Sequence, residues 1–148
     1  MSERSQPTAL FDIIGTCFSL EKPRHSLAKL GAPDYALEMW FAQALRDSFA
    51  FSHAGAYLPL KDMLQAELTR TALQLGLRPS DDDLRGVLGT FAELDLRPDL
   101  AAAVQVLADR SWQLLALTMG ASESTAAFSS GPASTIASAA CSHGTRSR

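Results

Sequence analysis

Cysteines and long apolar segments are scarce in this 148-residue chain. Its two cysteines, Cys17 and Cys141, have neither the spacing of metal ligands nor that of a redox motif, so they indicate no site of either kind. No apolar run approaches the ~20 residues that a membrane-spanning helix needs. The first ten residues also lack the apolar core of a signal peptide. We therefore expect a cytoplasmic protein that has no membrane partner.

Positive charge is scarce as well. The sequence has 13 lysines and arginines against 16 aspartates and glutamates, which gives a net charge of -3. Proteins that bind nucleic acids or anionic membranes depend on an excess of basic residues, so we expect neither partner. The length suits one domain. The composition indicates a mildly acidic globular protein, and the function has to be read from local motifs.

One aspartate lies inside an apolar run near the start of the chain. The run from Ala9 to Ile14 is too short for a typical helix, and Gly15 ends it, so we expect a buried strand of a parallel sheet. A charged Asp12 inside such a strand costs free energy. Ligands of open α/β sheets bind at the carboxyl ends of the strands, where Asp12 is expected to lie. The alternative is that Asp12 only caps the following turn.

A second short apolar run, from Trp112 to Leu117, also has the pattern of a buried strand and leads into Thr118, Met119 and Gly120. Five helices are expected between the two strands. A strand, a helical excursion and a second strand form a crossover unit, which places the two strands parallel. The expected helices cover residues 23–30, 34–51, 59–75, 80–90 and 100–108.

Two of the expected helices carry apolar faces. We expect the face of the third helix to be buried, so Leu64→Ala should destabilise the fold by roughly 2 to 5 kcal/mol and Arg70→Ala by little. The face of the second helix comprises Leu37, Trp40, Phe41, Ala44, Leu45 and Phe49, and that of the third Leu60, Leu64, Leu68, Ala72 and Leu75.

Local signals mark where some helices begin and end. Gly31 can take the left-handed conformation that stops the first helix. Ser80 with Asp83 three residues later resembles a capping box, and the acidic run from Asp81 to Asp83 suits the positive end of a helix. Helix capping explains this run better than metal binding does.

The residues from Phe11 to Thr16 resemble the first motif of the haloacid dehalogenase superfamily, and those from Thr118 to Gly120 resemble its second motif. The likeness covers roughly residues 8–128 and is greatest to the L-2-haloacid dehalogenases. It implies an α/β fold: a partial Rossmann-like core with parallel strands and an inserted α-helical cap. The expected segments are 8–20 for the first core strand and nucleophile loop, 21–97 for the cap, 98–128 for a core helix and second strand, and 129–148 for a tail whose composition predicts disorder.

The resemblance implies hydrolytic dehalogenation of a small 2-haloacid through an aspartyl ester. Asp12 is the nucleophile in this reading, and Gly15, Thr16 and Thr118 contact the carboxylate substrate. Phosphatase members of the superfamily carry a second aspartate two residues after the first and use magnesium. This chain has Ile14 there, which favours carbon–halogen chemistry with no metal and no cofactor.

The sequence departs from the family pattern at several positions. Met119 replaces an amide residue of the second motif, and Phe41 stands where these dehalogenases present an arginine that takes up the halide. Arg46 is a possible substitute, although an arginine solvated on the helix surface is the better explanation.

A lysine that the family places after the second motif has no counterpart here, since the lysines are Lys22, Lys29 and Lys61. We therefore expect a truncated chain that has very low activity by itself. Any remaining hydrolysis of the carbon–halogen bond should be abolished by Asp12→Asn. The alternative is a truncated, non-catalytic relative that acts through association of its helical cap, for example as a homodimer.

Overall fold

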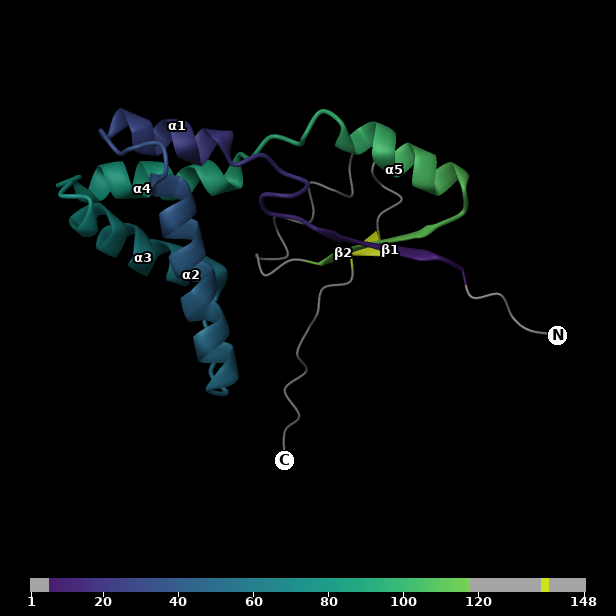
Figure 1. The fold of residues 1–148 in the computed structure, drawn as a ribbon, viewed down its shortest axis with the longest axis horizontal. Helices are drawn as coiled ribbons and strands as arrows, with labels where there is room; N and C mark the ends of the chain where they lie inside the picture. Colours follow the sequence, from purple (N-terminus) through teal and green to yellow (C-terminus); the bar gives the residue numbers. More distant parts are fainter. Residues whose placement is uncertain (1–5, 118–136, 139–148) are drawn as a thin grey trace. The chain divides into compact units, whose positions relative to one another are not determined.

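The computed structural model describes residues 6–117 and 137–138 (Figure 1). The chain divides into two compact units. We call the described residues up to Phe18 and from Leu96 onward the core unit, and Ser19–Asp95 the helical unit. The elements follow in the order β1 (Thr8–Asp12), α1 (Glu21–Lys29), α2 (Ala36–His53), α3 (Leu60–Gln74), α4 (Asp81–Gly89), the short 3-10 helix η1 (Thr90–Ala92), α5 (Leu100–Asp109), β2 (Gln113–Leu117) and β3 (Ala137–Ser138).

The core unit is built on a parallel sheet in the order β1-β2-β3. β1 pairs with β2 from Thr8 opposite Gln113 to Asp12 opposite Leu117, so both strands end at the same edge. The expected α/β class and the parallel pairing of the two strands are therefore confirmed. The sequence did not predict β3, whose two residues pair in parallel with β2. The other residues of the tail that was expected to be disordered lie outside the described residues.

The burial of the two long strands differs from the prediction. Leu114 and Ala116 of β2 are buried, and α5 contributes the buried Val104 to the same unit. Most residues on the opposite face of the sheet are exposed, with Leu10 at 59% exposure. The expectation of burial on both faces is therefore wrong: α5 packs against β2, and Leu10 and Leu117 on the other face are exposed.

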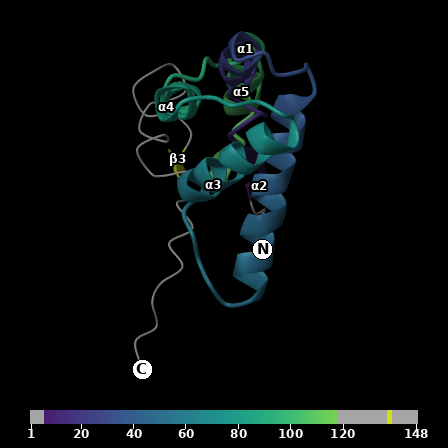
Figure 2. The same ribbon diagram turned by 90° about the vertical axis from the view of Figure 1, so that its left-hand side faces the viewer.

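The helical unit is organised around the packing of α2 against α3, which lie side by side in Figure 2. Trp40 of α2 is fully buried, and its indole N–H donates a hydrogen bond of 2.8 Å to the backbone carbonyl of Leu64 in α3. The ring of Phe91 meets Trp40 edge-on and stacks on Phe41. This arrangement fixes the two helices to each other and to η1.

The predicted face of α3 is largely confirmed. Its buried residues include four of the expected five, and the face is wider than the sequence indicates because Met63, Glu67 and Thr71 are buried too. The predicted face of α2 is confirmed at its start, but Phe49 near its end is exposed. The four confirmed positions on α3 are Leu60, Leu64, Leu68 and Ala72.

The predicted helix signals are present. Gly31 follows α1 with a φ of 83°, the left-handed conformation that glycine adopts without strain. At the start of α4 the Ser80 side chain accepts from the backbone N–H of Asp83, and the Asp83 side chain accepts from the backbone N–H of Ser80. The acidic run therefore belongs to a capping box.

The two ends of the helical unit are joined to each other. The backbone N–H of Ser19 donates to the carbonyl of Asp95 across 2.8 Å, and the Lys22 ammonium lies 2.9 Å from the Asp95 carboxylate. The segment from Ser19 to Asp95 is thus an insertion whose entry and exit are adjacent. That residues 21–97 form a cap domain stays a prediction. Among the described residues, no helix has the length and hydropathy needed to cross a membrane.

Candidate active site

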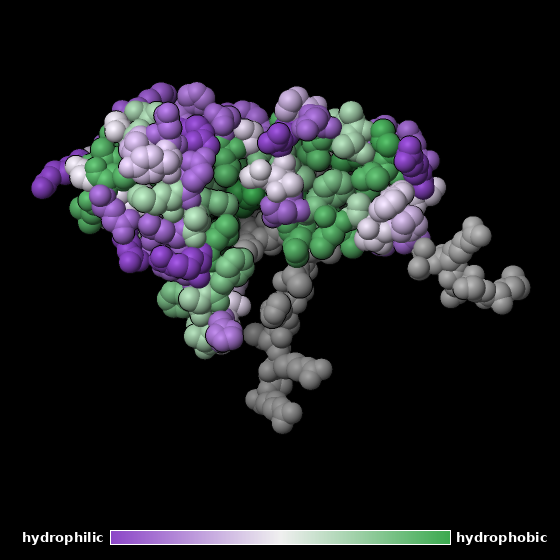
Figure 3. Space-filling model, viewed as in Figure 1, coloured by the Kyte–Doolittle hydropathy of each residue, from purple (hydrophilic) through white to green (hydrophobic). Residues whose placement is uncertain are grey.

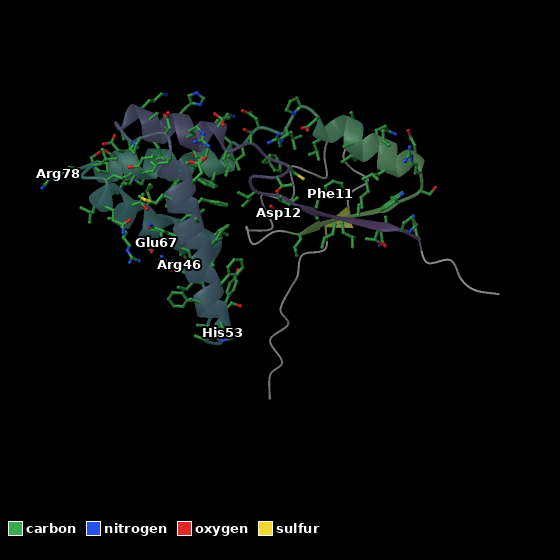
Figure 4. All side chains as sticks on the ribbon, in the orientation of Figure 1. Phe11, Asp12, Arg46, His53, Glu67 and Arg78 are labelled. Carbon is green, nitrogen blue, oxygen red and sulfur yellow. The ribbon has the colours of Figure 1, made fainter. Side chains whose placement is uncertain are left out.

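Asp12 is the last residue of β1 and lies at the carboxyl edge of the sheet, as Figure 4 shows. Its side chain is on the face of the sheet that also carries Leu10, away from the buried residues Leu114 and Ala116. The residue is exposed, so its carboxylate is open to a small molecule. This position agrees with the expectation that the strand delivers Asp12 to the ligand-binding edge.

A tight loop follows Asp12. The backbone N–H groups of Cys17 and Phe18 both donate to the carbonyl of Ile13 at 3.0 Å, and the N–H of Gly15 donates to the carbonyl of Phe18. Gly15 has a φ of 85°, which a residue with a side chain adopts only with strain. The loop therefore reverses within a few residues and returns Thr16 to the end of the strand.

The return of the loop brings Thr16 to Asp12. The Thr16 hydroxyl donates a hydrogen bond of 2.8 Å to Oδ2 of the aspartate. The resemblance implies that Thr16 contacts the substrate, and in the structure its hydroxyl contacts the nucleophile candidate. That Gly15 and Thr16 contact a substrate stays a prediction. The other carboxylate oxygen of Asp12, Oδ1, accepts no hydrogen bond from this hydroxyl.

The side chain of Cys17 is buried beneath the same loop, as expected for a small apolar residue. Burial, and secondarily the negative charge of Asp12, raise the pKa of its thiol to about 11. The thiol is therefore neutral at physiological pH and unsuited to act as a nucleophile. The spacing of the cysteines in the sequence indicated no site at Cys17 and gave no sign of its electrostatic interaction with Asp12.

The second predicted motif, Thr118 with Met119 and Gly120, lies outside the described residues. The structure does fix the residue before it, since Leu117 is the register partner of Asp12. The role of Thr118 in substrate binding stays a prediction.

Two side chains on α2 bear on halide binding: Phe41 stands where the family presents its arginine, and Arg46 is the possible substitute. Both have other partners in the structure. Phe41 stacks on Phe91, with ring centroids 6.5 Å apart. Arg46 pairs with Asp47 across 2.6 Å, and this hydrogen bond lowers the pKa of the Asp47 carboxyl. Because its charge is already matched by a neighbour on the same helix, Arg46 is a weak candidate for anion binding.

The histidines do not form a catalytic arrangement within the described part of the chain. His25 makes its hydrogen bond to the backbone carbonyl of Glu21, and His53 is exposed near the end of α2 (Figure 4). Across residues 6–117 and 137–138, no group of three or more His, Cys, Asp or Glu side chains is placed to hold a metal ion.

This chain is similar to known proteins in its structure and not in its sequence. No protein-family model matches the chain, and no curated protein sequence matches it. Among solved structures, the L-2-haloacid dehalogenase from Xanthobacter autotrophicus with chloropropionic acid covalently bound has a TM-score of 0.71 and 22% sequence identity. The match covers 87% of this chain and 54% of that enzyme.

Two further solved structures are similar. A second L-2-haloacid dehalogenase has a TM-score of 0.79 at 20% identity, over 90% of this chain and 63% of that one. A protein described as a dehalogenase has a TM-score of 0.77 at 21% identity, over 91% of this chain and 62% of that one. The chain therefore spans between about half and two thirds of the length of these structures, and it shares their fold.

Proposed function

We propose that this chain, whose fold is that of the L-2-haloacid dehalogenases, catalyses hydrolytic dehalogenation of a small 2-haloacid with Asp12 as the nucleophile. The observation that carries the proposal is the exposed Asp12 carboxylate at the carboxyl edge of a parallel sheet, held by the Thr16 hydroxyl at 2.8 Å. The acid covalently bound in one similar structure is chloropropionic acid, which supports a 2-halocarboxylate as the substrate class.

The reaction takes place in two displacements. A carboxylate oxygen of Asp12 attacks C2 of the haloacid, and the carbon–halogen bond breaks with its electron pair leaving on the halide. The product of this step is an ester between Asp12 and the acid. Water then adds to the Asp12 carbonyl carbon and the ester C–O bond breaks, which releases the 2-hydroxy acid, restores the carboxylate and gives one proton to the solvent. Neither step requires a redox partner or a metal ion.

The loop residues have distinct tasks in this proposal. Thr16 holds one carboxylate oxygen of Asp12, which leaves the other oriented for attack. Gly15 allows the sharp turn that returns Thr16 to the strand end. Thr118 directly follows the register partner of Asp12, so its hydroxyl is our candidate for binding the substrate carboxylate.

A comparison of two substrate classes tests the proposal. Purified full-length protein is incubated with 2-chloropropionate and, separately, with a generic phosphate ester, each with and without magnesium. We expect slow chloride release that magnesium does not change, and no phosphate release, because Ile14 replaces the second aspartate of the phosphatases. Magnesium-dependent phosphate release, or chloride release no faster than without protein, would contradict it.

The second candidate is a non-catalytic protein that acts through association of its helical unit. It is favoured by one observation, the set of large apolar side chains exposed at the end of α2 and in the loop after it. Association and hydrolysis are compatible. Only the absence of halide release would leave association as the single function.

We propose the cytoplasm as the location, where a free thiol such as that of Cys17 remains reduced.

A further inference from the structure

The described residues of the core unit include two arginines and no lysine, and the two arginines lie at opposite ends of α5. Arg97 comes shortly before this helix, and Arg110 directly follows it. In Figure 3 the surface over α5 is mainly apolar, with hydrophilic colouring at each end of the helix. Because a short turn joins α5 to β2, the helix runs back along the sheet and begins near the carboxyl ends of the strands (Figure 1). Arg97 is therefore the described cation of this unit at the edge where Asp12 lies.

A backbone contact ties Arg97 to the loop that follows Asp12. The backbone N–H of Arg97 donates to the carbonyl of Cys17 across 2.9 Å. Cys17 directly follows Thr16, whose hydroxyl holds the Asp12 carboxylate at 2.8 Å. These residues all belong to the core unit. The position of Arg97 relative to the candidate nucleophile is thus set by hydrogen bonds within one compact unit.

The guanidinium of Arg97 is open to a ligand. Its side chain is 52% exposed and makes no hydrogen bond to any residue within 6–117. Its ion-pair partner is Asp99, whose Oδ1 lies 3.6 Å from Nε, beyond hydrogen-bonding distance. The Asp99 side chain is itself exposed, and an ion pair of this kind contributes little stability. An incoming carboxylate can therefore replace Asp99 as the partner of Arg97.

The proposed reaction needs a positive charge at this edge. It brings a 2-halocarboxylate, which is an anion, to the ionised carboxylate of Asp12, and like charges repel. The hydroxyls of Thr16 and Thr118 supply hydrogen bonds but no positive charge. We propose that the Arg97 guanidinium binds the carboxylate of the substrate and thereby selects haloacids over uncharged halogen compounds. A guanidinium suits this task because its planar fork donates two parallel N–H···O bonds to a carboxylate.

The inference rests on the proposed function and gives Asp99 a definite part in it. Asp99 competes with the substrate for Arg97. Its side chain makes no hydrogen bond that caps α5, so its charge can be removed without the loss of a helix cap. Asp99→Asn should therefore strengthen carboxylate binding, whereas Arg97→Gln should weaken it. Opposite effects from two residues so close together would not result from a general disturbance of the loop.

A chemical-shift titration of isotope-labelled full-length protein with propionate, at constant ionic strength, tests the proposal. Propionate carries the carboxylate but no leaving group, so it cannot react. We expect it to shift the backbone amides of Thr16 and Arg97. Arg97→Gln should weaken binding by about three- to tenfold, and Asp99→Asn should strengthen it by about twofold or more. The matched control is Arg110→Gln, which removes an exposed arginine from the other end of α5 and should leave binding unchanged.

A kinetic comparison separates a binding role from a structural one. Arg97→Gln should raise KM for 2-chloropropionate and leave KM for the uncharged 2-chloropropionamide unchanged, and Arg97→Lys should recover part of the loss because it keeps the charge. An absence of propionate binding, an equal affinity in Arg97→Gln, or an equal loss in Arg110→Gln would overturn the proposal.

The two proposals can fail separately. Propionate binding that depends on Arg97, without chloride release from 2-chloropropionate, would contradict the proposed function and leave the anion site in place. Chloride release with the same KM in the wild-type protein and in Arg97→Gln would contradict the role of Arg97 and leave the proposed function in place.

Discussion

The Thr16 hydroxyl donates its hydrogen bond to Oδ2 of Asp12 across 2.8 Å, closing a loop that contains only three residues between them. A hydrogen bond to a charged group is shorter and stronger than one between neutral groups. This contact therefore holds the carboxylate in one orientation before any ligand arrives. The proposed chemistry depends on that orientation, because a displacement at carbon requires the attacking oxygen to be in line with the leaving group.

Removing this hydroxyl should slow formation of the Asp12 ester. We expect Thr16→Val to reduce the single-turnover rate with 2-chloropropionate by about tenfold or more, while Thr16→Ser keeps most of it. Intact-mass spectrometry over time measures the rate. An unchanged rate in the valine variant would show that the hydrogen bond has no part in positioning the nucleophile.

The buried face of α3 predicts a difference between two leucines of one helix. Leu64→Ala should destabilise the protein by about 2 to 5 kcal/mol, because Leu64 is buried beside Trp40. Leu73→Ala should change the free energy of unfolding by less than about 0.5 kcal/mol, since that side chain is open to solvent. Urea unfolding measures both, and equal effects would contradict the assignment of the helix face.

Arg70→Ala, which the sequence suggested as the control for Leu64→Ala, is not a neutral substitution in the structure. Arg70 lies 3.3 Å from Oε1 of Glu67, whose side chain is buried. Arg70→Ala leaves this buried carboxylate without its arginine partner, which costs free energy although the arginine itself is 55% exposed. The expectation that Arg70→Ala costs little is therefore not supported by the packing of α3, and Leu73 is the better control.

The thiol of Cys17 should resist alkylation in the folded protein. Burial is the main cause of its raised pKa, about 11, and the charge of Asp12 adds to it. We expect iodoacetamide at pH 8 to modify Cys17 far more slowly in the native protein than in urea, as peptide mapping can measure. Asp12→Asn should increase the native rate slightly, because it removes the secondary cause. Equal rates in the folded and unfolded protein would show that the thiol is open.

The raised pKa of Cys17 also has a consequence for stability. Its folded value of about 11 exceeds the ordinary value of 9.0, so the folded state holds the thiol proton more tightly. The corresponding contribution to stability is complete below pH 9 and is lost as the pH rises from about 9 towards 11. Cys17→Ala should flatten this alkaline decline in the thermal midpoint, and a decline of equal slope would assign it to other groups.

Carboxylates on the helical unit predict a loss of stability in acid. The hydrogen bond from Arg24 is the main cause that lowers the pKa of Glu38 below its usual 4.5. A lowered pKa in the folded state gives a contribution that is present above pH 4.5 and is lost as the pH falls through the folded value. Glu38→Gln should therefore reduce the difference between the thermal midpoints at pH 7 and pH 3. Glu93→Gln is the control, because that exposed side chain makes no ion pair within residues 6–117.

Local features of this fold were predictable from the sequence. The capping box of Ser80 and Asp83 and the left-handed stop at Gly31 depend on residues within a few positions of each other. The two strands were predictable because short apolar runs ended by glycine or polar residues are typical of a parallel sheet. Asp12 was recognisable as a candidate because a carboxylate in such a run has a cost that packing does not explain.

Features set by tertiary contacts were not predictable. Phe49 continues the apolar pattern of α2, yet the neighbouring helix leaves it open, because α3 begins only at Leu60. The periodicity of α3 also gave no sign that Glu67 would be buried beside Arg70. Hydropathy patterns record which faces are apolar, but the lengths and positions of neighbouring elements decide which of them are covered.

The central claim is that Asp12 is the nucleophile, and peptide mapping after incubation with 2-chloropropionate tests it most directly. The wild-type protein should carry an adduct of the acid without its chlorine on the peptide that contains Asp12, and the same peptide of Asp12→Asn should carry none. Asparagine keeps the shape of the side chain and removes its nucleophilic charge. An adduct on another residue, or the same adduct yield in Asp12→Asn, would contradict the account.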